Sequence, residues 1–88
     1  MADSISAFRR HVKAAASTLR HIERSKCARN AGASERNVDF HVNAADAILR
    51  AACHDTTDPL PDYLDSPRGQ RLSETWNRVE RQAAGLCA

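Results

Sequence analysis

The sequence holds few of the residues that build β-sheets, disulfide frameworks or membrane spans. Only 5% of its 88 residues are aromatic, and residues with high β-propensity never alternate with polar ones over a useful length. Its three cysteines have no CxxC or CxxxC spacing, which argues against a disulfide framework and against a zinc site made of cysteines. No apolar run approaches the roughly 20 residues that cross a bilayer, and the N-terminus lacks the apolar core of a signal peptide. We therefore expect an all-α, cytoplasmic protein with reduced thiols and no membrane contact.

Side chains that carry catalysis or hold metals are also few and poorly spaced. Cys53, His54 and Asp55 are consecutive, so on a helix they point about 100° apart and do not converge on one substrate atom. The four histidines form no HxxxH or HExxH pair, and the glycines form no phosphate-binding loop. We therefore predict that the protein is not an enzyme and has no catalytic residues, no cofactor and no metal site.

Apolar residues in the middle of the chain recur with helical spacing along two lines. One line consists of Val38, Val42, Ala45, Leu49 and Ala52. The other consists of Phe40, Ala44, Ala47 and Ala51. Intervals of three and four residues place each line on one side of a helix. Residues 35–53 are therefore predicted to form a central helix that contacts neighbours on two sides and water on a third.

Two further helices are predicted, one before and one after this central helix. The first spans about residues 4–29, with Asp3 or Ser4 as its N-cap. Its single apolar seam consists of Ile5, Phe8, Val12, Ala15, Leu19 and Ile22. The last spans about residues 67–84, with Ser66 as N-cap, Pro67 at the first helical position and Gly85 just after the end. Its seam consists of Leu72, Trp76, Val79 and Ala83.

These seams predict a single domain over residues 1–88, folded as a three-helix bundle with the second helix in the middle. A chain of this length buries enough surface for one modest core. The side chains predicted to form that core are Phe8, Leu19, Val42, Leu49, Trp76 and Val79. Because alanine supplies much of the remaining apolar surface, we expect the helices to pack closely.

Glycine and proline mark the two connections between the helices. Residues 30–33 are predicted to form a short turn, with Gly32 after the end of the first helix and Ser34 as N-cap of the second. So short a turn places the two helices side by side and antiparallel. Residues 55–67 contain four aspartates, three prolines and no Lys or Arg, which predicts a linker with one helical turn beginning at Pro61.

Residues 27–42 have the sequence CARNAGASERNVDFHV, in which the small and apolar positions are Ala28, Gly32, Ala33, Ser34 and Val38. This spacing resembles the turn of helix-turn-helix DNA-binding domains. The resemblance implies two crossing helices, the second of which offers Arg36, Asn37 and Asn43 to DNA. The pattern departs from that family at His41, where an apolar residue is usual, and its acidic residues would be repelled by phosphate. A capped turn between two alanine-rich helices would produce the same pattern of residues without any DNA binding.

The net charge of +2 hides an uneven distribution. Residues 1–34 carry seven Lys or Arg against two acids, residues 35–65 carry two against seven, and residues 66–88 carry four against two. On the first helix the cations lie away from the apolar seam, at Arg9, Arg10, Lys13, Arg20 and Arg24. We predict that these residues bind a partner, with neutralisation by the aspartates of residues 55–65 as the alternative. Glu74 and Arg78 are spaced for an ion pair on the last helix.

A short chain without a convergent catalytic set is expected to act by occupying a surface on a larger molecule. The predicted function is a small, non-enzymatic protein-binding module of the adaptor, regulator or inhibitor kind that bacteria or their mobile elements encode. Its basic helix face would meet an acidic protein surface or a nucleoprotein complex. The alternative is a nucleic-acid-binding protein of the helix-turn-helix type. A monomer is favoured over a homodimer that would pack through Phe40 and the alanines in line with it.

Overall fold

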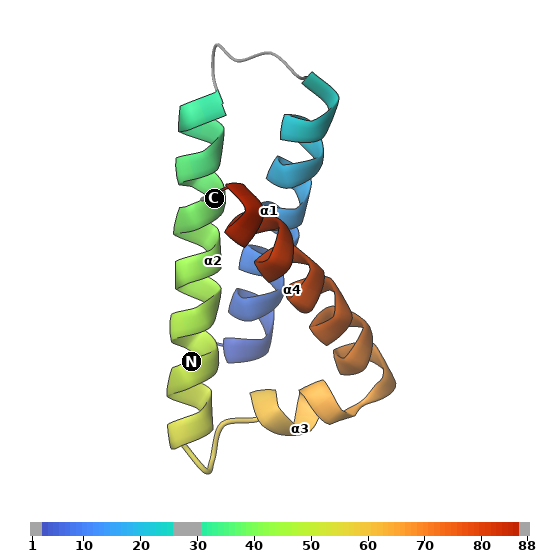
Figure 1. Ribbon diagram of the computed structural model, residues 1–88. Helices are drawn as coiled ribbons and strands as arrows, with labels where there is room; N and C mark the ends of the chain where they lie inside the picture. Colours follow the sequence, from blue (N-terminus) through green and yellow to red (C-terminus); the bar gives the residue numbers. More distant parts are fainter. Residues whose placement is uncertain (1–2, 26–30, 87–88) are drawn as a thin grey trace.

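The computed structural model describes residues 3–25 and 31–86, and every regular element within those ranges is a helix (Figure 1). Helix α1 spans Ser4–Ser25 and α2 spans Ala31–His54. The short helix α3 spans Leu60–Asp65, and α4 spans Pro67–Leu86. The prediction of an all-α fold is confirmed, but the number of helices is four in the described residues rather than three.

Helices α1 and α2 lie side by side and run in opposite directions, as the short connection between them predicts (Figure 1). Helix α3 turns the chain at the end of this pair where α2 finishes, and α4 then returns obliquely across it (Figure 1). The side chain of Asp58 fixes this corner, because its Oδ1 accepts hydrogen bonds from Ser4 Oγ at 2.5 Å and from Leu60 N at 2.9 Å. The starts of α1 and α3 are therefore tied together.

Capping predictions are confirmed at the starts of α1 and α4. Asp3 Oδ1 accepts a hydrogen bond from Ile5 N at 3.1 Å, and the second oxygen of the same carboxylate accepts one from Ser6 Oγ at 2.8 Å. Ser66 Oγ accepts a hydrogen bond from Gly69 N at 3.1 Å and donates one to Tyr63 O at 2.5 Å. Ser66 therefore ends α3 and begins α4 with a single side chain.

The core is formed by residues from all four helices. Its buried side chains are Phe8, Val12, Ala15, Leu19, Val38, Ala45, Ala52, Leu60, Leu72, Trp76 and Val79. The predictions for Phe8, Leu19, Trp76 and Val79 are confirmed, whereas Val42 and Leu49 are only partly buried at its edge. Leu60 of α3 is fully buried as well, so the helical turn predicted in the linker contributes a side chain to the core.

Helix α2 contacts α1, α3 and α4, but only one of its two predicted apolar lines is covered. The seam that begins at Val38 faces the core, but the second line is largely uncovered: Phe40 is 63% exposed, and Ala47 and Ala51 are exposed as well. The reason lies in side-chain size, because alanines bury little apolar area per residue. Helix α4 instead places Trp76 against Phe8 of α1, with ring centroids 5.6 Å apart.

Two predicted helix ends are also wrong. Helix α2 begins at Ala31, so Gly32 lies within its first turn and Ser34 is not its N-cap. Helix α4 continues through Gly85 to Leu86. One glycine costs a helix about 1 kcal/mol, which neighbouring helix-forming alanines offset in both places. Residues 26–29, predicted to end the first helix, lie outside the described residues.

The local structure also differs from that of a helix-turn-helix domain. Gly32 and Ala33, predicted to lie in the turn, are helical, while Ala28 lies outside the described residues. Helices α1 and α2 run alongside each other rather than crossing at the roughly 90–120° of that motif (Figure 1). The resemblance in sequence therefore does not extend to the arrangement of the two helices.

Candidate functional site

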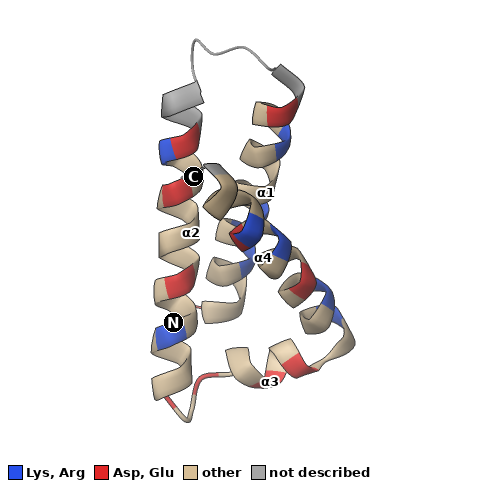
Figure 2. Cartoon of the chain, viewed as in Figure 1, with Lys and Arg blue, Asp and Glu red and all other residues tan. Residues whose placement is uncertain are grey.

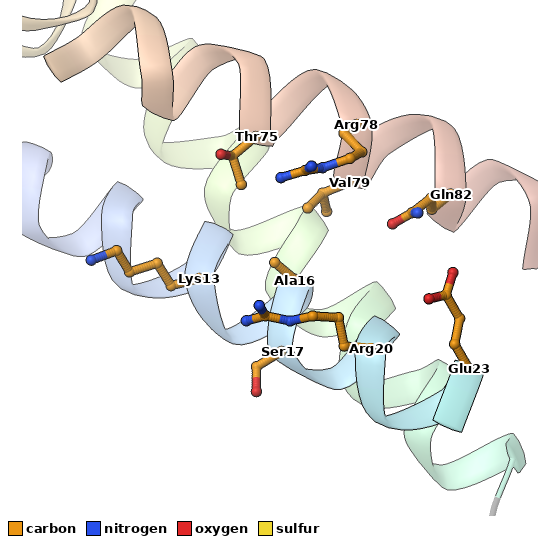
Figure 3. A pocket seen from close by; sticks show the side chains of 9 residues that line it. All are labelled: Lys13, Ala16, Ser17, Arg20, Glu23, Thr75, Arg78, Val79 and Gln82. Carbon is orange, nitrogen blue, oxygen red and sulfur yellow. The ribbon is translucent and has the colours of Figure 1, made fainter. Parts of the chain in front are cut away.

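Two adjoining hollows lie between α1 and α4. The larger has a volume of about 660 Å³ and is lined by Lys13, Ala16, Ser17, Arg20, Glu23, Thr75, Arg78, Val79 and Gln82 (Figure 3). The smaller has a volume of about 310 Å³ and is lined by Arg9, Lys13, Tyr63, Arg68, Arg71, Leu72 and Thr75. Both hollows are lined by Lys13 and Thr75, so they adjoin each other. We call the two hollows together the basic groove.

The rims of the basic groove are strongly cationic. Its six basic residues are Arg9, Lys13 and Arg20 from α1 and Arg68, Arg71 and Arg78 from α4. Glu23 is the one acid among the lining residues, and all seven of these side chains are exposed. Figure 2 shows Lys and Arg along α1 and α4, whereas the segment leading into α3 and α3 itself carry acids. The groove therefore presents concentrated positive charge to solvent.

The floor of the groove is apolar. Val79 and Leu72 of α4 are buried and line the larger and the smaller hollow, respectively. In Figure 3 the side chains of Ala16 and Val79 point toward one another from the two helices. Half-buried Tyr63 of α3 extends the apolar surface beneath the smaller hollow. An occupant of the groove would thus meet apolar atoms beneath it and cations on both sides.

The groove is electrically polar along its length. Arg9 of α1 lies at the same end as Arg68 and Arg71 of α4, and this end has no acid among its lining residues. At the other end Glu23 and Gln82 face each other (Figure 3). Because residue numbers rise together on both walls, α1 and α4 run in the same general direction along the groove, although α4 is inclined to α1 (Figure 1). Their N-terminal ends, where the helix dipole is positive, coincide with the more cationic end.

The structure brings together three of the five residues predicted to bind a partner. Arg9, Lys13 and Arg20 line the groove, whereas Arg10 is exposed but lines neither hollow. The side chain of Arg24 lies outside the described residues. Arg9, Lys13 and Arg20 of the predicted line therefore form one wall of the site.

Sequence reasoning missed the wall that α4 contributes. Arg71, Thr75, Arg78 and Gln82 follow intervals of four, three and four residues beside the apolar seam, so the signal was present. It was overlooked because Arg78 was predicted to pair with Glu74. Glu74 and Arg78 do not form an ion pair. Among the side chains that the structure describes, the ion pair within a helix is that between Arg50 Nε and Asp46 Oδ2 on α2, at 2.9 Å. Arg78 lies along the groove (Figure 3).

Among the described side chains, no ion pair joins an aspartate of the linker to a cation of α1. Asp55 Oδ1 accepts hydrogen bonds from Thr57 Oγ1 at 2.6 Å and from Thr57 N at 2.9 Å, and these bonds hold the pKa of the Asp55 carboxyl below its ordinary value. Asp58 is engaged by Ser4 and Leu60. Both carboxylates therefore have hydrogen-bond partners other than the cations of α1.

The residues predicted for DNA contact lie on α2, outside the groove. Arg36, Asn37 and Asn43 are all exposed. Asn37 Nδ2 donates a hydrogen bond to Thr18 Oγ1 at 3.4 Å, and Asn43 Nδ2 donates one to Asp39 Oδ2 at 3.3 Å. Both amides thus have partners within the protein, and the nearby Asp39 adds negative charge to this face.

Comparison with protein-family models, curated proteins and solved structures gave no match. No helix in the described part of the chain is long and apolar enough to cross a membrane. Within the same residues, no three His, Cys, Asp or Glu side chains gather in the way a metal ion would need.

A pair of histidines joins α1 to α2 away from the groove. His11 Nδ1 and His41 Nδ1 lie 2.9 Å apart, and both rings are half-buried. One ring donates and the other accepts, so the contact requires at least one neutral imidazole. Burial, the neighbouring His41 and the charge of Arg10 lower the pKa of His11 below its ordinary value of 6.5.

We expect the free energy of unfolding to fall as the pH is lowered from 7.5 to 5. The depressed pKa means that His11 stays neutral in the fold at a pH where the unfolded chain already takes up a proton, so acidification favours unfolding. Urea denaturation at both pH values measures this fall in the free energy of unfolding. The fall should be smaller in the His11→Gln variant than in the parent. Asp3 and Asp55, whose pKa values are also lowered, lose their contribution only below about pH 3.8. An equal loss in His11→Gln would contradict this assignment.

Proposed function

We propose that this protein is a non-enzymatic protein-binding module that holds an acidic segment of a partner protein in the basic groove. The observation that carries the proposal is the combination of cationic rims with an apolar floor. Carboxylates of a partner would meet the guanidinium and ammonium groups, and its apolar side chains would cover the half-buried Ala16 and Tyr63. Burial of the apolar part supplies affinity, and the charges guide association and fix the register.

A protein segment suits this surface better than nucleic acid does. A phosphate backbone supplies charge for the rims but no apolar side chains for the floor. Single-stranded nucleic acid is held by aromatic side chains on which successive bases stack, and Tyr63 is the one aromatic ring among the lining residues. An adaptor, regulator or inhibitor that uses the groove would therefore recognise acidic and apolar side chains in alternation.

The double variant Arg20→Glu and Arg78→Glu should weaken binding to the partner by about tenfold or more. Each exposed charge contributes on the order of 0.2–1 kcal/mol, reversal replaces attraction by repulsion, and about 1.4 kcal/mol corresponds to tenfold. The matched control is Arg10→Glu with Arg81→Glu, which changes the net charge equally on the same two helices but outside both hollows. Both variants should melt at nearly the parent temperature, because their altered side chains are exposed.

The measurement is affinity capture from host lysate, with and without nuclease treatment, using the parent and both double variants as bait, followed by titration of the captured protein. Loss of capture with the groove variant alone supports the proposal. Equal loss with the control variant would show that net charge, not the groove, is recognised. If capture requires intact nucleic acid and depends on Arg36, Asn37 or Asn43, the partner is nucleic acid and the proposal is wrong.

A further inference from the structure

We propose that the occupant of the basic groove is an acidic amphipathic α-helix, lying antiparallel to α1 and α4 with its acids toward its C-terminal end. This inference rests on the proposed function and specifies the shape and direction of the partner segment. Three features of the groove carry it: its length, the spacing of its cations and its electrical polarity.

The length of the groove suits a short helix. On α1 the lining residues extend from Arg9 to Glu23, and on α4 they extend from Arg68 to Gln82. Each wall therefore covers fourteen helical steps, or about 21 Å. A partner helix of about fourteen residues would fill the valley between the two walls. Ala16 is small and faces Val79 (Figure 3), which leaves room for a third helix to approach closely.

Cation spacing distinguishes a helix from an extended peptide. Lys13 and Arg20 on one wall are seven residues apart, and Arg71 and Arg78 on the other wall are also seven residues apart. This separation is two helical turns, or about 10.5 Å. A helix presents the same side every seven residues, so acids at i and i+7 on both flanks would meet both pairs. An extended strand repeats its facing side about every 6.6 Å and would not match.

The direction of the partner helix follows from charge. The N-terminal, positive ends of α1 and α4 lie beside Arg9, Arg68 and Arg71, and Glu23 lies at the opposite end. A partner helix has its negative dipole end at its C-terminus. Acids placed there would meet the most cationic part of the groove, and its positive N-terminus would lie beside Glu23. The antiparallel orientation is therefore favoured over the parallel one.

The probe is a synthetic eighteen-residue peptide with an alanine and leucine stripe, glutamates seven residues apart on both flanks, and its charge concentrated toward the C-terminus. A hydrocarbon staple on the solvent face keeps it helical, and a nitroxide is attached at its C-terminal end. The first control peptide has the same sequence in reverse order. The second has the same composition with the glutamates moved out of the seven-residue spacing. Both carry the same staple and label.

Binding is followed by nuclear magnetic resonance on the full ¹⁵N-labelled chain. We expect the nitroxide to broaden the amide signals of Arg9, Arg68 and Arg71 and to spare those of Glu23 and Gln82. The reversed peptide should bind about fivefold more weakly, because charge–dipole contacts of about 1 kcal/mol become unfavourable. The peptide with altered spacing should also bind more weakly, and the Arg20→Glu, Arg78→Glu variant should lose binding about tenfold or more.

The outcomes separate this inference from the proposed function. Broadening at Glu23 and Gln82, or equally at both ends, would overturn the orientation. Equal affinity for the peptide with altered spacing would overturn the helical register. If no peptide binds but capture of the lysate partner still depends on Arg20 and Arg78, the helix inference fails and the proposed function stands. If that capture does not depend on these two residues, the proposed function fails as well.

Discussion

Replacement of Phe8 by alanine is expected to lower the free energy of unfolding by about 3–5 kcal/mol. Phe8 is fully buried on α1, and its ring packs edge to face against Trp76 of α4, with centroids 5.6 Å apart and planes inclined by 66°. Truncation leaves a cavity where α1 meets α4, and the helices cannot close it without moving apart. A domain of this size has a total stability on the order of 4–13 kcal/mol, so this loss removes a large share of it.

The matched control for this prediction is Phe40→Ala on α2. Phe40 is the same residue type, but its side chain is 63% exposed, so the change should be within about 0.5 kcal/mol. Urea denaturation followed by circular dichroism measures both variants. A Phe40 variant that is destabilised as strongly as the Phe8 variant would mean that Phe40 is covered in solution, by a second copy of the chain or by a different arrangement of α4.

The sequence predicts burial correctly for a helix that has a single apolar seam. The seam of α1 is continuous, and its central residues Phe8, Val12, Ala15 and Leu19 are all buried as expected. The start of α4 was predictable because Ser66 and Pro67 are a strong local signal. Local rules determine these features, so no knowledge of the rest of the fold was needed.

The arrangement of the helices was harder to predict, because α2 has two apolar lines and the sequence does not show which one is covered. The alanines that follow Phe40 are compatible with a contact but do not require one. What decides the packing is the site where large side chains meet, and Phe8 with Trp76 brings α4 to the side of α1. This contact involves residues 68 positions apart, so periodicity within either helix cannot reveal it.

The same limit applies to the candidate site. Arg9, Lys13 and Arg20 could be selected because they form a line on one helix. Arg71 and Arg78 gain their role only when α4 lies beside that line. The buried contact between Phe8 and Trp76 therefore brings the two walls of the groove together. The charge-reversal variants change exposed residues only, so a loss of binding in them does not reflect a loss of the fold.

Replacement of Gly69 by alanine should be about as damaging as the loss of Phe8, although it adds only one methyl group. Gly69 is buried in the first turn of α4, where α3 crosses it. A Cβ atom at this position would overlap the backbone carbonyl oxygen of Tyr63 and lie 2.5 Å from Leu64 Cα. Because both neighbours are backbone atoms, no side-chain rotation relieves the overlap. Helix α3 would have to move away from α4, at a cost of about 3 kcal/mol or more.

This displacement has a consequence for the groove as well as for stability. Moving α3 withdraws Leu60 from the core and Tyr63 from the floor of the smaller hollow, and it releases the Ser66 cap at the start of α4. Gly85→Ala is the control, because a Cβ there meets nothing within 4 Å and should stabilise the end of α4 by up to about 1 kcal/mol. Thermal melts compare the two variants with the parent, and amide spectra report on Arg68 and Arg71. A Gly69→Ala protein that melts with the parent would show that α3 and α4 do not approach this closely, and the smaller hollow would then need a different floor.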